Sequence, residues 1–212
     1  LRGIPVTIKF PADDEITTQQ QNYIKSYFNL MESAVYASNY TDPVNGYRKY
    51  LDVESFLKHF ITGEFSGNMD TYWSTYMYKD REENQFHVAP CWDFDLAFDN
   101  DNRIYPVNSR RDWAYRDGSS AGNMKNFVNR LIGDNATYQQ LKQMWLDNRK
   151  VYPEEQFKAL RQFIDEDANG RSDGHRQVVA QSVVTDAFGT SRGRQYVDGN
   201  GRVGHRQCSK RS

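Results

Sequence analysis

Three carboxylates flank a segment that the sequence predicts to be a β-hairpin. Residues 73–79 are rich in aromatic side chains of alternating character, and residues 85–91 form a second candidate strand after a polar turn. Asp70 precedes the first strand, whereas Asp93 and Asp95 follow the second. Antiparallel strands lie about 4.8 Å apart, so a hairpin brings its entry and its exit to the same end. The sequence therefore predicts carboxylates gathered at one end of a small sheet, where they can hold a divalent cation or act as a base beside one.

Ordinary structural roles compete with this chemistry. Asp70 alone is typical of a turn in which the side chain accepts hydrogen bonds from backbone N–H groups. Asp93 and Asp95 can belong to an Asp-rich turn at a strand end or, with Asp99 and Asp101, to a calcium loop. The glycine and the distal glutamate of an EF-hand-type loop are missing, however. Spacing alone leaves the structural alternative open.

Composition excludes several classes of protein. The chain has 212 residues, which is long enough for one substantial core. Its net charge of −1 provides no overall positive potential that would attract nucleic acid. No run of about 18 apolar residues could span a membrane, and no stretch resembles a signal peptide. Cys91 and Cys208 have neither disulfide-framework nor metal-site spacing. His59 and His87 lack a nucleophile or metal partner at a telling spacing, so we assign them no role.

Helical periodicity dominates the part of the chain before residue 165. Thr17 or Thr18 can cap a first helix, and Asp52 can cap a second that ends at Gly67. Further helical patterns follow at residues 127–145 and 157–164. Residues 4–10 are instead predicted to form a strand, which Pro11 ends.

The composition changes near residue 168. Residues 168–212 contain no Leu, Ile, Met or Trp. Such a segment cannot bury enough apolar surface to offset a backbone ordering entropy of about 1–2 kcal/mol per residue. We therefore expect a domain over residues 1–167 and a disordered basic tail over residues 168–212. A shift of reading frame near residues 165–170 is an alternative cause of the change.

Four segments together resemble the CotH kinase family, the spore-coat protein H-like atypical protein kinases. The most specific are residues 67–79 (GNMDTYWSTYMYK) and 89–100 (APCWDFDLAFDN), which are similar to the family's Asn-x-Asp, aromatic strand and Pro-x-Trp-Asp pattern. Residues 8–17 (IKFPADDEIT) and 28–34 add two supporting similarities. The resemblance covers roughly residues 4–165.

The resemblance implies an α+β, atypical protein-kinase-like fold. The described pattern corresponds mostly to the helical C-lobe with a catalytic β-hairpin. The chain starts at the strand that would carry the phosphate-contacting lysine, so we expect the N-lobe to be truncated and any phosphate-covering loop to precede Leu1.

The resemblance also implies a division of roles at the site. Asp70 would orient or deprotonate the acceptor hydroxyl, and Asp93 would hold Mg²⁺ or Mn²⁺ against the phosphates of ATP. Asp95 would add a ligand or an outer contact. Lys9 would contact the phosphates, and Glu32 would be its ion-pair partner.

One position departs from the kinase pattern. An Asn five residues after the catalytic Asp usually binds a second metal ion, and the family often has Asn there, but this chain has Thr75. A threonine hydroxyl is a weaker, neutral oxygen ligand, so catalysis with two metal ions is left open.

The expected function is therefore transfer of the ATP γ-phosphate to Ser or Thr of a secreted, surface or coat protein. This places the protein outside the cell, on the cell surface or in the spore coat. One alternative is a non-catalytic surface or coat interaction module that keeps the kinase-like fold. Another is a carboxylate-pair hydrolase such as a glycosidase. Thermal stabilisation that needs both nucleotide and Mg²⁺ would separate the first from the other two.

Overall fold

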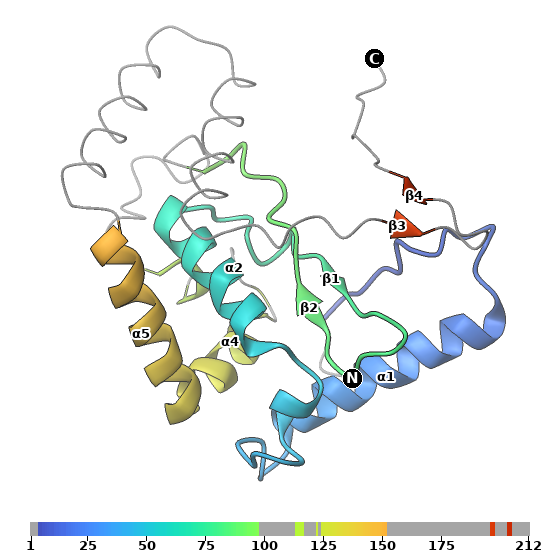
Figure 1. The fold of residues 1–212 in the computed structure, drawn as a ribbon, viewed down its shortest axis with the longest axis horizontal. Helices are drawn as coiled ribbons and strands as arrows, with labels where there is room; N and C mark the ends of the chain where they lie inside the picture. The colour runs from blue at the N-terminus through green and yellow to red at the C-terminus, as the bar shows by residue number, and fades with distance from the viewer. Residues whose placement is uncertain are drawn as a thin grey trace, which may run out of the picture.

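The computed structural model describes residues 4–97, 113–116, 122 and 124–151, together with residues 196–197 and 203–204 (Figure 1). Its α-helices are α1 (Thr18–Tyr36), α2 (Val53–Ser66), α4 (Met124–Gly133) and α5 (Asn135–Val151), with short 3-10 helices η1 (Tyr47–Lys49) and η2 (Ala114–Arg116). Strands β1 (Met77–Tyr78) and β2 (His87–Val88) form one antiparallel pair, and β3 (Tyr196–Val197) and β4 (Val203–Gly204) form another. The described elements confirm the predicted α+β class.

Helix α1 begins where the sequence predicted. The Thr17 hydroxyl accepts a hydrogen bond from the backbone N–H of Gln20 at 3.2 Å, and the Gln20 side chain accepts one from the N–H of Thr17 at 2.8 Å. This reciprocal capping box satisfies two backbone donors that the first helical turn leaves unpaired. At the other end, Arg130 of α4 donates to the carbonyls of Val35 and Ala37 at 3.0 and 2.6 Å. A side chain of α4 thereby satisfies carbonyls at the end of α1.

Both predicted ends of α2 are confirmed. The carboxylate of Asp52 accepts a hydrogen bond from the backbone N–H of Glu54 at 3.1 Å. Gly67 terminates the helix with φ 64° and ψ 28°, a left-handed conformation that glycine adopts without a steric penalty. The chain can therefore reverse sharply at the point where Asp70 follows.

The predicted hairpin is present but shorter than the sequence suggested. Met77 pairs with Val88 and Tyr78 with His87. The first predicted strand loses its beginning because residues 70–74 form a turn instead, and Pro90 has no N–H to extend the second. The chain still enters and leaves the hairpin at one end, as the sequence argument required.

The strand predicted over residues 4–10 is wrong. The structure assigns these residues no strand, and the side chains of Val6 and Phe10 are 54% and 61% exposed. A strand needs a neighbouring edge with which to exchange backbone hydrogen bonds, and no described strand pairs with this segment. Pro5 and Pro11 also lack the N–H groups that a ladder would use.

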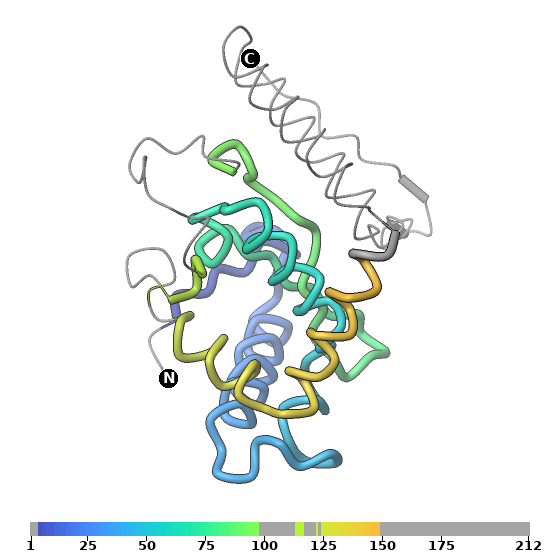
Figure 2. Tube along the Cα trace, turned by 90° about the vertical axis from the view of Figure 1, so that its left-hand side faces the viewer, coloured from blue at the N-terminus to red at the C-terminus, as the bar shows by residue number. Residues whose placement is uncertain are grey.

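Helix α2 lies at the centre of the described fold. It contacts β2, α5 and η2, whereas α4 contacts α1, α5 and η2 (Figures 1 and 2). The core between these elements is aromatic and aliphatic, with Phe56, Phe60 and Phe127 each at most 3% exposed. Burying a side chain of this size stabilises the fold by roughly 1.5–3 kcal/mol. The core therefore fixes α2, whose C-terminal end carries the Asp70 turn.

Several sequence predictions fall on other parts of the chain. The helix expected at residues 157–164 and most of the loop between residues 97 and 122 lie outside the described residues. So does the expected tail at residues 168–212, apart from β3 and β4. None of the helices in the described part of the chain is long and apolar enough to cross a membrane.

Candidate active site

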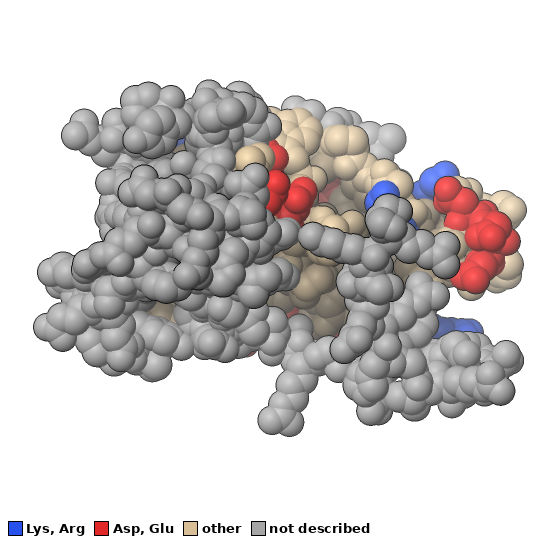
Figure 3. Space-filling view, turned by 90° about the horizontal axis from the view of Figure 1, so that it is seen from above, with Lys and Arg blue, Asp and Glu red and all other residues tan. Residues whose placement is uncertain are grey.

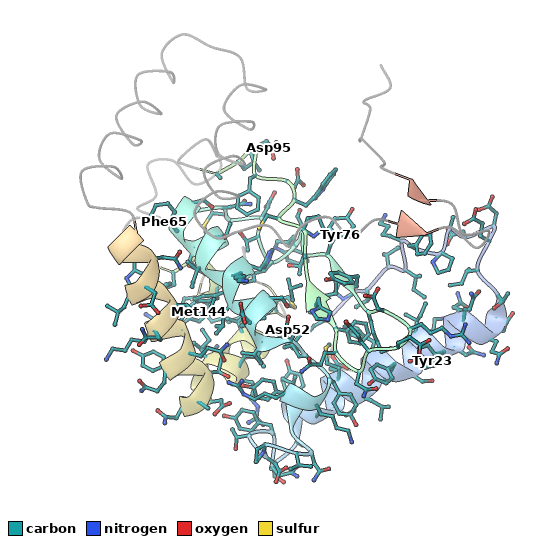
Figure 4. The ribbon with its side chains drawn as sticks, in the orientation of Figure 1. Tyr23, Asp52, Phe65, Tyr76, Asp95 and Met144 are labelled. Atoms are coloured by element: carbon teal, nitrogen blue, oxygen red, sulfur yellow. The ribbon has the colours of Figure 1, made fainter. Side chains whose placement is uncertain are left out.

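The segment that carries Asp70 is a tight turn directly after α2. The backbone N–H groups of Trp73 and Ser74 both donate to the carbonyl of Asp70 at 2.9 Å, so Asp70 begins a single helical turn. In Figure 4, Asp95 lies near the same end of α2 as Phe65. Figure 3 views the molecule from that side and shows acidic side chains at the surface. The predicted carboxylates thus lie near the C-terminal end of one buried helix.

The side chain of Asn68 joins the two predicted catalytic segments. It is completely buried. Its Oδ1 accepts a hydrogen bond from the backbone N–H of Asp70 at 3.1 Å, and its Nδ2 donates to the backbone carbonyl of Asp93 at 3.1 Å. Leaving a buried polar group unpaired costs about 1–3 kcal/mol, so the amide favours this one arrangement of the two backbones. A single side chain therefore holds the backbones of Asp70 and Asp93 close together.

A second contact holds the carboxylate of Asp93. The hydroxyl of Ser74, in the Asp70 turn, donates to Asp93 Oδ2 at 3.1 Å. Asp93 has φ 63°, in the left-handed region that few residues other than glycine adopt, although aspartate is enriched there. Because its carbonyl is bound by Asn68 and its carboxylate by Ser74, this backbone conformation is fixed from both sides.

Asp95 lies in contact with Asp93. Partial burial raises the pKa of the Asp95 carboxyl, and the negative charge of Asp93 and a hydrogen bond between the two side chains raise it further. Two adjacent carboxylates repel each other, and a shared proton or a cation removes that repulsion. Mg²⁺ is commonly held by one or two carboxylates together with phosphate oxygens and water, so this pair fits such a cation. Among the described residues no group of three or more His, Cys, Asp and Glu side chains could hold a metal ion.

The hydroxyl of Thr75 points away from this pair. Its Oγ1 donates to the backbone carbonyl of Thr71 at 2.8 Å and lies 3.4 Å from Nε2 of His59 in α2. His59 Nε2 is also 3.3 Å from the carbonyl of Thr71. Gly63 of α2 faces the same turn, and an added Cβ there would lie 2.3 Å from the Thr71 methyl carbon. The turn is therefore packed tightly onto α2 through Thr71 and Thr75.

A partly buried glutamate, Glu64, attaches two further segments to α2. The carboxylate of Glu64 accepts hydrogen bonds from the Tyr72 hydroxyl at 2.5 Å and from the backbone N–H groups of Ala114 and Tyr115 at 2.7 and 2.9 Å. Burial raises the pKa of the Glu64 carboxyl above its ordinary value, and these hydrogen bonds offset part of that rise. Tyr72 belongs to the Asp70 turn, and Ala114 begins η2. Glu64 thus ties both the turn and η2 to the same helix.

Replacing Glu64 by alanine should lower the free energy of unfolding by about 2–3 kcal/mol, because two backbone N–H groups and a buried hydroxyl lose their acceptor. Urea unfolding followed by circular dichroism measures this. Glu54→Ala is the matched control on the same helix: Glu54 is 60% exposed and forms an exposed ion pair with Lys58, so its loss should cost less than about 1 kcal/mol. Equal effects for the two variants would contradict the anchoring role of Glu64.

The structure does not join Lys9 to Glu32. Lys9 is exposed on the N-terminal segment before α1, whereas Glu32 is 6% exposed within α1. No ion pair connects these two side chains in the described part of the chain. Their predicted role at a nucleotide therefore stays a prediction.

The residues that support the carboxylates carried little signal in the sequence. Asn68 was visible only as part of the Asn-x-Asp pattern, and Ser74 and Glu64 carried no signal of their own. The two histidines given no role are both bonded: His59 as described, and His87 between the carboxylates of Asp52 and Glu83 at 2.9 and 2.7 Å. Glu83 lies only four residues before His87, whereas Asp52, Thr71 and Thr75 come from more distant parts of the chain that no local spacing could predict.

The fold and site define an α+β protein whose buried helix ends at a set of acidic residues. A model of the CotH kinase protein family matches residues 7–177. The match spans most of the chain, so this protein belongs to the CotH kinase family, as the sequence resemblance predicted. The match extends past residue 167, and the domain boundary placed there stays a prediction. Neither the curated proteins nor the solved structures compared with the chain gave a match.

Proposed function

We propose that this chain is the phosphoryl-transfer part of a metal-dependent protein Ser/Thr kinase that uses ATP. Membership of the CotH kinase family supports a kinase-like protein. The observation that carries the proposal at the level of residues is Asn68, whose amide binds the backbones of Asp70 and Asp93 at 3.1 Å each. A kinase needs one Asp at the acceptor hydroxyl and another at the cation, close to each other.

In this proposal each carboxylate has one task. Asp70, on its turn, orients the acceptor hydroxyl and accepts its proton. Asp93 and Asp95 hold Mg²⁺ or Mn²⁺, which when bound would neutralise charge on the transferred phosphoryl group. Ser74 and Asn68 keep Asp93 in place, because they bind its carboxylate and its carbonyl respectively. The kinase-like fold, and Lys9 and Glu32 at the nucleotide, belong to the same proposal.

The acceptor we propose is a Ser or Thr of a secreted, surface or coat protein, because the family is associated with the spore coat. The protein itself would then act outside the cell, on its surface or in the coat.

Thermal unfolding of the complete gene product tests this function. ATP with Mg²⁺ should raise the midpoint by roughly 5–10 °C at about 100 times the dissociation constant, whereas either ligand alone should have little effect. Asp93→Ala should remove the shift, and Glu54→Ala, at an exposed position at the opposite end of α2 from Asp70, should keep it. An absence of any shift in the wild type would contradict nucleotide binding and favour the non-catalytic interaction module.

A further inference from the structure

We propose that Ser74, and not Thr75, supplies the neutral oxygen ligand for the divalent cation at Asp93. The inference rests on the proposed function and names a residue of the same site. In the kinase pattern the neutral ligand would fall at position 75. In the structure the neighbouring hydroxyls of Ser74 and Thr75 have different hydrogen-bond partners.

The hydroxyl of Thr75 is already committed to the protein interior. Its single proton is donated to the Thr71 carbonyl at 2.8 Å, and its other polar neighbour is His59 Nε2 at 3.4 Å. His59 is 4% exposed and belongs to α2. Turning Thr75 toward Asp93 would break this hydrogen bond to the Thr71 carbonyl and the contact with His59.

The hydroxyl of Ser74 instead faces the carboxylate. It donates to Asp93 Oδ2 at 3.1 Å, and the backbone N–H of Ser74 donates to the Asp70 carbonyl at 2.9 Å. A hydroxyl has one donor and two lone pairs, so donating to Asp93 leaves the oxygen lone pairs available to a cation. Mg²⁺ and Mn²⁺ prefer such hard oxygen ligands.

Asn68 does not compete for this role. It is fully buried, its Oδ1 accepts from Asp70 and its Nδ2 donates to Asp93. The amide of Asn68 therefore positions the backbones of the site, whereas the hydroxyl of Ser74 contacts the carboxylate of Asp93 itself. The proposed ligand set in the described residues is Asp93, Asp95 and Ser74, with phosphate and water oxygens completing it.

Mn²⁺ binding in the presence of ATP, measured by electron paramagnetic resonance on the complete gene product, tests the inference. Ser74→Ala should weaken Mn²⁺ affinity roughly 10-fold or more, and the adjacent variant Thr75→Val should change it less than about 2-fold. Circular dichroism checks that both variants are folded. Normal binding by Ser74→Ala, or an equal loss in Thr75→Val, would overturn the assignment of Ser74.

Replacing the oxygen of Ser74 by sulfur tests whether residue 74 coordinates the cation directly or only hydrogen-bonds to one of its ligands. Ser74→Cys should weaken Mg²⁺ binding but retain Cd²⁺ binding, because a thiolate is a soft ligand, whereas Thr75→Cys should leave this preference unchanged. Equal loss of both metals in Ser74→Cys would overturn direct coordination. If the wild type binds neither metal with ATP, the proposed function falls together with this inference; wild-type binding with an unchanged Ser74→Ala would overturn the inference alone.

Discussion

Replacing Asp70 by asparagine should lower the rate of phosphoryl transfer roughly 10²–10⁴-fold, the usual contribution of a positioned general base. Asparagine has nearly the same shape and keeps the backbone hydrogen bonds of the turn to Trp73 and Ser74. It cannot accept the proton of the acceptor hydroxyl. We therefore expect the affinity for ATP and Mg²⁺ to stay within about 3-fold of the wild type, so that the loss appears in kcat.

The measurement is transfer of labelled γ-phosphate to a protein acceptor, made on the complete gene product beside nucleotide titrations. Glu54→Gln makes the same change from carboxylate to amide at an exposed position at the other end of α2 and should leave transfer unchanged. Transfer at the wild-type rate by Asp70→Asn would refute the role of Asp70. Loss of ATP binding in that variant would instead show that Asp70 belongs to the metal site.

The stability of the protein should fall by about 3 kcal/mol between pH 6.5 and pH 4 through His59 alone. Burial lowers the pKa of His59 from its ordinary 6.5 to about 4 in the folded protein. Between these two values the unfolded chain holds a proton on His59 that the folded chain does not. The free energy of unfolding therefore decreases as the pH falls, which is the sign expected when the folded state has the lower pKa.

The variant His59→Gln isolates this contribution. Glutamine can still donate to the Thr71 carbonyl, which His59 Nε2 approaches to 3.3 Å, but it does not titrate. Urea unfolding of wild type and variant at several pH values between 4 and 7 gives the difference directly, because the other titratable groups contribute to both. Parallel loss of stability in the two proteins would contradict a depressed pKa at His59. His59 contacts Thr71 and Thr75, which follow Asp70 in the chain. Protonation of His59 at acid pH should therefore also weaken the packing of the Asp70 turn on α2.

The amino-acid sequence by itself determined the features that depend on neighbours in the chain. Thr17 and Gln20 are three residues apart, so the capping box of α1 follows from local hydrogen bonding. Asp52 and Gly67 mark the ends of α2 for equally local reasons, since one side chain caps a nearby N–H and the other residue tolerates a positive φ. Hairpin topology likewise placed Asp70 and Asp93 near one end without knowledge of the fold.

Only the tertiary structure decided how the acidic residues are held. The partners of Asp93 include Asn68 and Ser74, and those of Glu64 include Ala114 and Tyr115, which lie far along the chain. The orientations of Ser74 and Thr75 depend on which face of the turn packs against α2, and two adjacent hydroxyls give no sequence signal for that choice. The strand predicted over residues 4–10 is absent for a similar reason: residues with strand propensity form a strand only when a neighbouring strand edge supplies hydrogen bonds. Local patterns thus specify helix ends and turns, whereas the packing of the turn onto α2 determines which oxygen atoms meet at the site.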